Sequence, residues 1–149
     1  MARILILGYG NPLRTDDGLG WRAAELLSSQ FLADEVQVQT CHQLLPEMVD
    51  MIGQVEATIF IDAAQDGEPG ELRCERVLPE AVPARFTHQL SPAAMLAWSQ
   101  KLYGRCPQAF LVSVCGGSFA LGGRLSPAVS ASLPRLAELV GALTNRLMH

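Results

Sequence analysis

An apolar run that stops at a glycine-rich loop constrains this chain more than any other feature. Residues 3–7 read Arg-Ile-Leu-Ile-Leu and lead directly into the loop Gly8-Tyr9-Gly10-Asn11-Pro12-Leu13-Arg14-Thr15-Asp16-Asp17-Gly18-Leu19-Gly20. The run is typical of a buried parallel strand, and the pattern from Leu19 to about Phe31 predicts an amphipathic helix. Strand-to-helix turns lie at the carboxyl edge of an α/β sheet, where ligands bind, so the adjacent carboxylates of Asp16 and Asp17 mark a candidate site.

Strand signals recur along the rest of the chain. Apolar or alternating segments predict further strands near residues 36–40, 57–63, 71–77 and 109–114. Helical patterns separate most of these segments, which predicts a three-layer α/β/α sandwich around a mostly parallel sheet of about five strands. The alternating segment is typical of a half-exposed edge strand, expected to run antiparallel. Right-handed crossovers give the order 2-1-3 for the first three strands, so the ends of the first and third strands face one crevice.

Helix starts carry their own signals. A short helix is expected after Pro46, and Ser-Pro pairs at Ser91 and Ser126 resemble an N-cap followed by proline at the first helical position. The helix from Ser91 is expected to reach about Tyr103. Within the last helix, Pro134 predicts a kink or a later start.

Composition limits the class of protein. The 149 residues are 49% hydrophobic and 17% charged, which suits one domain spanning residues 1–149 with one well-developed core. The net charge of -4 argues against nucleic-acid binding, and no stretch is long enough to insert into a membrane. The four cysteines are scattered without a CxxC pair, which is typical of free thiols in the reducing cytoplasm.

Three residues besides Asp16 join the candidate site. Asp17 shares the loop with it, Asp62 ends an apolar strand, and His88 precedes a helix in a chain with three histidines. Each has a structural alternative: Asp16 or Asp17 can cap the first helix, Asp62 can tie down a loop, and His88 can be an ordinary surface group. If they converge, two carboxylates and one imidazole suit a borderline transition ion with open coordination positions.

The glycine-rich loop does not match the nucleotide-binding motifs. A dinucleotide fingerprint requires glycine where Leu13 stands, and the loop lacks the lysine of a P-loop. Two acids in the turn would also repel a pyrophosphate. No organic cofactor is therefore expected.

The chain resembles the nickel–iron hydrogenase maturation proteases. The resemblance rests on the Gly-x-Gly-Asn loop with its Asp-Asp pair, on Ile61-Asp62-Ala63, on His88-Gln89-Leu90, and on Gly123-Arg124-Leu125-Ser126-Pro127-Ala128-Val129. These motifs occur in order across almost the whole chain. The resemblance implies an endopeptidase that removes a C-terminal extension from a hydrogenase large-subunit precursor once nickel has been inserted. The metal-contacting positions of the family fall on Asp17, Asp62 and His88, and the nickel is presented by the substrate.

Three positions depart from the family pattern. The first metal-contacting residue is often glutamate in relatives, so Asp17 has a shorter reach. After the second strand the chain reads Cys41-His42-Gln43-Leu44-Leu45-Pro46-Glu47, which resembles the branch serving soluble, cofactor-reducing hydrogenases. The segment Val114-Cys115-Gly116-Gly117 also differs from relatives. These differences bear on partner recognition more than on the reaction.

The residue that activates water stays open at this level. Asp16 or Asp17 as general base is the preferred hypothesis, and nickel-bound water is the alternative, so an aspartic-type and a metal-assisted mechanism are both retained. Asn11 can hold the loop or donate to an oxyanion.

Two other functions compete with the peptidase. One is a nickel-checking escort that binds the large subunit without cutting it. The other is a cysteine hydrolase with Cys41 or Cys115 as nucleophile and His42 or His88 as base.

Overall fold

The chain folds around a mixed five-stranded sheet. The computed structural model describes residues 2–81 and 90–149, and within them the sheet has the order β2-β1-β3-β5-β4. The strands are β1 (Ile4–Tyr9), β2 (Val36–Cys41), β3 (Ala57–Ala64), β4 (Leu72–Val77) and β5 (Gln108–Cys115). The first three and β5 run parallel, whereas β4 pairs antiparallel with β5 at one edge. The predicted order 2-1-3 and the antiparallel edge strand are both confirmed.

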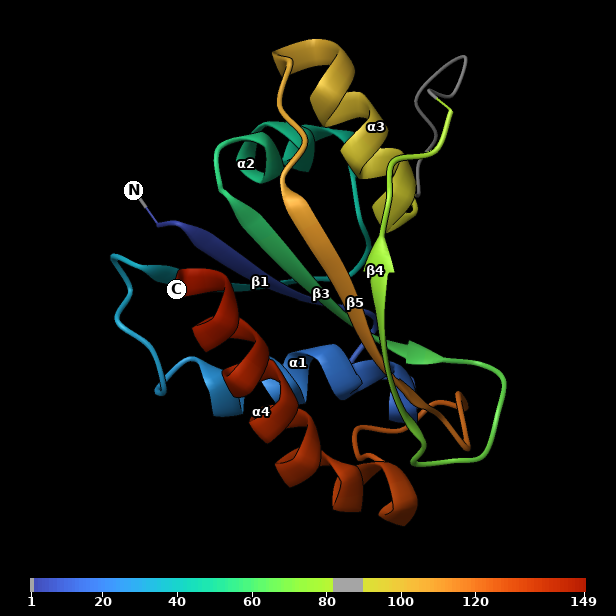
Figure 1. Ribbon diagram of the computed structural model, residues 1–149. Helices are drawn as coiled ribbons and strands as arrows, with labels where there is room; N and C mark the ends of the chain where they lie inside the picture. The colour runs from blue at the N-terminus through green and yellow to red at the C-terminus, as the bar shows by residue number, and fades with distance from the viewer. Residues whose placement is uncertain (1, 82–89) are drawn as a thin grey trace.

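Helices cover both faces of this sheet. α1 (Leu19–Leu27) and α4 (Pro127–Met148) lie on one face, and α2 (Val49–Gly53) and α3 (Pro92–Tyr103) lie on the other (Figure 1). Two 3₁₀ turns, η1 (Thr15–Gly18) and η2 (Pro46–Met48), lead into α1 and α2. The three-layer α/β/α sandwich is therefore confirmed. No helix in the described part of the chain is long and apolar enough to cross a membrane.

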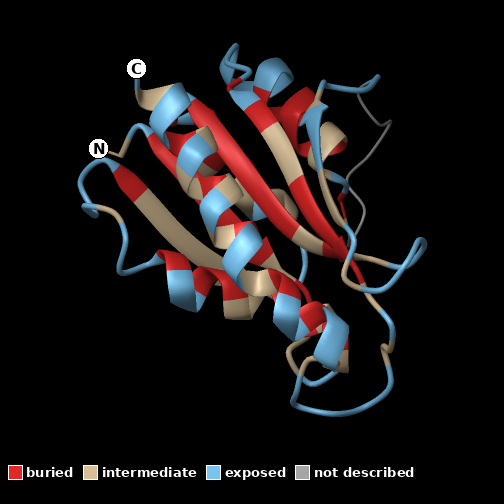
Figure 2. Ribbon diagram, turned by 60° about the horizontal axis from the view of Figure 1, so that its bottom comes forward, coloured by how far each residue is buried: buried red, intermediate tan, exposed pale blue. Residues whose placement is uncertain are grey.

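Alternate side chains of the central strands fill two separate cores. Ile4 and Ile6 of β1 pack with α1 and α4, while Leu5 and Leu7 pack with α2 and α3. Phe60 of β3 is fully buried on the second side. Figure 2 shows the buried residues in red, concentrated in the central strands and on parts of the helices. Burial on both faces explains why the sequences of β1 and β3 are nearly all apolar.

One helix boundary differs from the predictions. α1 ends at Leu27 instead of Phe31. The hydroxyls of Ser28 and Ser29 donate to the carbonyls of Glu25 and Leu26, and such local bonds compete with helix continuation. By contrast, α3 spans the predicted residues.

The later start predicted for the last helix is wrong. α4 begins at Pro127 and runs through Pro134. Pro134 is exposed, as is Ser130, the residue whose carbonyl loses its amide partner, while Val129, Leu136 and Val140 anchor the opposite side of the helix.

Glycines bring the start of α1 against the sheet. A Cβ on Gly20 would lie 2.6 Å from the amide nitrogen of Tyr9 and 2.8 Å from the carbonyl oxygen of Ile61. Backbone atoms cannot move aside as a flexible side chain can. Only glycine therefore lets η1 and α1 approach the carboxyl ends of β1 and β3.

We expect Gly20→Ala to lower the free energy of unfolding by about 1–3 kcal/mol or more, because the added methyl displaces backbone atoms. Gly141→Ala is the matched control, since its Cβ meets no atom closer than the Gln30 side chain at 4.0 Å. That control is expected to gain up to about 1 kcal/mol from helix propensity. Urea unfolding of both variants measures the difference, and equal stabilities would contradict this role of Gly20.

Candidate active site at the carboxyl edge of the sheet

Two strand ends and one helical turn form the centre of the site. β1 and β3 pair up to Gly8 and Ile61, so Tyr9 and Asp62 follow at neighbouring positions on the carboxyl edge. Asp17 lies on η1, above the same edge, and its charge acts on both residues. The structure thus brings Asp17 and Asp62 together at the topological switch point, although 45 residues separate them in the sequence.

Asp62 is a half-buried carboxylate with a strongly altered acidity. Burial is the main cause that raises its pKa to about 6, and the nearby charge of Asp17 raises it further. Two interactions act in the opposite direction: Oδ1 accepts a hydrogen bond from the Ala63 amide at 2.8 Å, and the phenol of Tyr9 bonds to the carboxylate. Burial beside Asp62 in turn raises the pKa of Tyr9.

Asp17 is held by the loop that precedes it. Its Oδ2 accepts a hydrogen bond from the backbone amide of Asn11 at 2.7 Å. The side-chain oxygen of Asn11 accepts from the Leu13 amide at 2.9 Å, which forms a local turn. Of the two roles considered for Asn11, holding the loop or donating to an oxyanion, these bonds support the first. Asp17 is half-buried, and within residues 2–81 and 90–149 no hydrogen bond engages its second carboxylate oxygen.

Asp16 has a different environment from its neighbour. It is fully buried, and its carboxylate accepts four hydrogen bonds, from the amides of Gly117 and Ser118 and from the amide and hydroxyl of Ser126. The distances run from 2.7 to 3.0 Å. Burial raises the pKa of Asp16, but these hydrogen bonds outweigh it, so the pKa lies below its usual range.

The helix-capping alternative for these two acids is wrong. The first turn of α1 has no side-chain cap, because the carboxylate of Asp16 bonds to the loop between β5 and α4 and that of Asp17 bonds to Asn11. Ser126 likewise precedes α4 without capping it, since its hydroxyl donates to Asp16.

The predicted third ligand, His88, lies outside the described residues. Two residues beyond His88, the amide of Leu90 donates to the carbonyl of Leu44 at 3.1 Å. Leu44 follows the end of β2. Among residues 2–81 and 90–149, no group of three or more histidine, cysteine or acidic side chains is placed to hold a metal ion.

Tyr9 and Ser126 are the site residues that sequence reasoning missed. A phenol between two glycines at a strand end was the available signal for Tyr9. Nothing local marks Ser126 as a partner of Asp16, because its Ser-Pro context equally predicts a helix cap.

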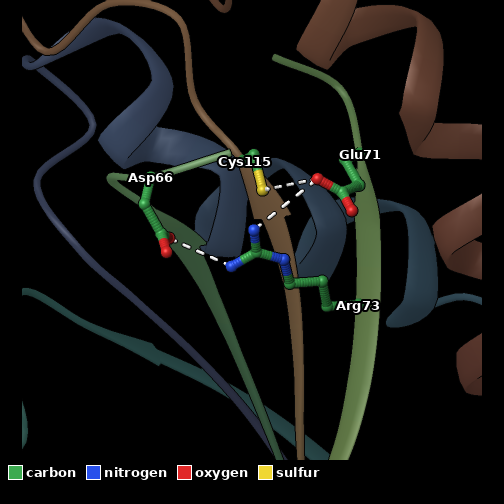
Figure 3. Close-up of polar contacts among 4 residues, drawn as sticks. All are labelled: Asp66, Glu71, Arg73 and Cys115. Carbon is green, nitrogen blue, oxygen red and sulfur yellow. Dashed lines mark hydrogen bonds and ion pairs between the residues drawn. The ribbon is translucent and has the colours of Figure 1, made fainter. Parts of the chain in front are cut away.

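The cysteines are poorly suited to nucleophilic attack. Cys115 is fully buried, and its thiol lies 3.7 Å from Glu71, which also contacts Arg73 (Figure 3). Burial raises the pKa of Cys115 and outweighs the opposing effect of Arg73. Burial likewise raises the pKa of Cys41 to about 11, and the neighbouring His42 ring packs edge-on against Trp21 at 5.4 Å. Both thiols are therefore held in the protonated, less reactive form.

Comparison with known proteins places the chain in a family. No protein-family model matches the chain. The chain is 31% identical over 150 residues to the hydrogenase 2 maturation protease of Escherichia coli (strain K12), covering 95% of this chain and 90% of that protein. It is also 32% identical over 122 residues to the hydrogenase expression/formation protein HupD of Bradyrhizobium diazoefficiens, covering 76% of this chain and 62% of that protein.

Solved structures agree with these relatives. The hydrogenase maturating endopeptidase HybD from E. coli matches with a TM-score of 0.79 and 31% identity, over 97% of this chain and 93% of that one. The [NiFe] hydrogenase maturation protease HycI from Thermococcus kodakarensis KOD1 matches with a TM-score of 0.77 and 27% identity, over 96% and 92%. The chain belongs to the family of nickel–iron hydrogenase maturation proteases and is a peptidase by that membership.

We expect Asp16→Asn to lower the free energy of unfolding by about 3 kcal/mol at neutral pH, because an amide cannot accept all four hydrogen bonds. The lowered pKa means that the ionised carboxylate stabilises the fold fully above its ordinary pKa of about 4, and that this contribution is lost as pH falls through the lowered value. The difference in the free energy of unfolding between wild type and Asp16→Asn should therefore become smaller at acidic pH. Urea unfolding across that pH range measures the gap, with exposed Asp34→Asn as control; a gap that is independent of pH would contradict the assignment.

The acidity of Asp62 offers a direct test of its contact with Asp17. In the metal-free protein its carboxyl carbon should titrate with a pKa of about 6 by NMR. Asp17→Asn removes a like charge and should lower that value, without restoring the ordinary one, because burial remains. Asp50→Asn, in α2, is the control and should leave the titration unchanged. An unchanged pKa in Asp17→Asn would show that the two carboxylates do not share the crevice.

Proposed function

We propose that this peptidase removes the C-terminal extension of a nickel–iron hydrogenase large-subunit precursor after nickel has been inserted. The observation that carries the proposal is the convergence of Asp17 and Asp62 at the carboxyl edge of the sheet, with the pKa of Asp62 raised to about 6. Two carboxylates held together in a partly buried crevice repel each other, and a cation brought by the substrate relieves that repulsion. The family membership supplies the substrate class.

Nickel enters this proposal as part of the substrate. Asp17 and Asp62 provide oxygen ligands, and we assign the nitrogen ligand to His88 on the resemblance to the family. This set would contact a nickel ion that the precursor already holds. Only a nickel-loaded precursor then offsets the charge of the two carboxylates, which gives discrimination against the empty form.

Asp17 is our candidate for the general base. Its Oδ2 is engaged by the Asn11 amide, which leaves the other oxygen for a water molecule. Asp16 accepts four hydrogen bonds and is fully buried, so we assign it the positioning of Asp17 instead of proton transfer. A water molecule bound to the substrate nickel is the rival nucleophile. The four cysteines are free thiols, in keeping with a reaction in the cytoplasm.

The experiment is intact mass spectrometry of a large-subunit precursor, nickel-loaded or nickel-free, after incubation with this protein. Loss of one C-terminal peptide from the loaded form alone is the expected result. Binding of the precursor without any change in its mass would show that the protein is an escort instead of a protease. Cleavage of both precursor forms would contradict the proposed role of the carboxylates in recognising nickel.

In the same assay we expect Asp17→Asn to slow cleavage by about 100-fold or more, since a positioned base contributes about that much. Asp16→Asn, assayed where it is folded, should slow cleavage less than Asp17→Asn does, because it disturbs the position of Asp17 without removing the base. Asp34→Asn is the surface control. Full activity in Asp17→Asn would favour nickel-bound water as the nucleophile. Loss of activity in folded Asp16→Asn, with activity retained in Asp17→Asn, would identify Asp16 as the general base.

A further inference from the structure

Two exposed leucines lie beside the candidate active site. The side chain of Leu13 is 64% exposed and that of Leu121 is 77% exposed. Leu13 belongs to the loop between β1 and η1, residues 10–14, and Leu121 to the loop between β5 and α4, residues 116–126 (Figure 1). We call these two residues the leucine pair. Neither side chain belongs to the two cores of the sandwich, so core packing does not explain why these positions are leucine.

Backbone hydrogen bonds place the leucine pair side by side. Arg14 and Gly122 form a parallel β-bridge, in which the Gly122 amide donates to the Leu13 carbonyl at 2.9 Å. The Thr15 amide donates to the Gly122 carbonyl at 2.8 Å. Leu13 and Leu121 each precede one partner of this bridge and therefore occupy matching positions on two parallel segments.

The leucine pair is displayed on a rigid support. Thr15 has a φ of 51°, an unfavourable conformation for a β-branched residue, and its hydroxyl donates to the Ala120 carbonyl at 2.5 Å. Asp16 fixes the same two loops through its carboxylate and through its amide, which donates to the Ser118 carbonyl at 3.0 Å. Strained backbone held by its surroundings is typical of functional sites. A preorganised apolar contact loses little entropy on binding.

Arginines border the leucine pair, although the chain carries a net charge of -4. Arg14 and Arg124 are exposed at the two loops, and Arg22 donates to the Gly123 carbonyl at 2.8 Å. This rim is complementary to an acidic surface.

We propose that the leucine pair is a docking contact for the folded body of the large-subunit precursor, which presents an apolar patch bordered by carboxylates. The inference rests on the proposed function. Asp17 lies two residues beyond Thr15, and its amide donates to the Arg14 carbonyl at 3.0 Å. A protein that brings its nickel and scissile bond to Asp17 must therefore cover the adjoining leucines. The contact selects the client through its surface, separately from the nickel.

The test is steady-state cleavage of the nickel-loaded precursor by Leu13→Ser, Leu121→Ser and the double variant. Each single change should raise KM by about 3- to 10-fold and the double change by about 30-fold or more, as loss of interface anchors does. The kcat should stay within about 2-fold, since neither leucine touches the reacting atoms. Arg124→Glu should also raise KM, by an amount that shrinks at high salt.

Leu32→Ser is the matched control, because Leu32 is 69% exposed in the turn before β2, at the opposite end of the sheet. It should leave KM unchanged. If wild type does not cleave the precursor, the proposed function fails; if wild type cleaves and the double variant keeps its KM, only the docking inference fails. A fall in kcat by more than 10-fold at constant KM would make the pair part of the catalytic site instead. Light scattering that shows a wild-type dimer and a monomeric double variant, with KM unchanged, would assign the pair to self-association.

Discussion

The carboxylate of Asp16 accepts four hydrogen bonds, and the arrangement of the candidate active site depends on them. These bonds join the turn after β1 to the loop before α4, two segments that also meet at the bridge between Arg14 and Gly122. A carboxylate buried without such donors would strongly destabilise the fold. With them, it acts as a fixed cross-link at the carboxyl edge, and it orients the residue that follows, Asp17.

Two neighbouring acids therefore take separate roles because their environments differ. Asp16 is surrounded by amide and hydroxyl donors, which favour its ionised form. Asp17 receives one amide hydrogen bond and faces Asp62, whose pKa is raised by burial and by the charge of Asp17. The pKa of Asp16 is lowered and that of Asp62 is raised, and such opposed shifts are typical of sites that bind cations or move protons.

Close backbone packing makes this meeting of carboxylates possible. Gly20 lets the first turn of α1 contact the ends of β1 and β3, which brings Asp17 to the crevice that Asp62 borders. The same loop connection carries Leu13 toward Leu121 through the bridge between Arg14 and Gly122. The carboxylates of the candidate site and the exposed leucines thus share one support, which fixes their positions relative to one another.

The sequence by itself determined the strands, most helix boundaries, the sheet order and the proximity of Asp17 to Asp62, because apolar periodicity and right-handed crossovers act locally or by general rule. Only the tertiary structure decided that Asp16, and not Asp17, is buried and engaged in structural hydrogen bonds. The donors that engage Asp16 stand 101 to 110 residues further along the chain, on a loop whose position no local pattern specifies. The end of α1 has a local cause, since the Ser28 and Ser29 hydroxyls bond to carbonyls three residues earlier. The uninterrupted course of α4 depends on the packed fold, which leaves Pro134 on the side of the helix that faces solvent.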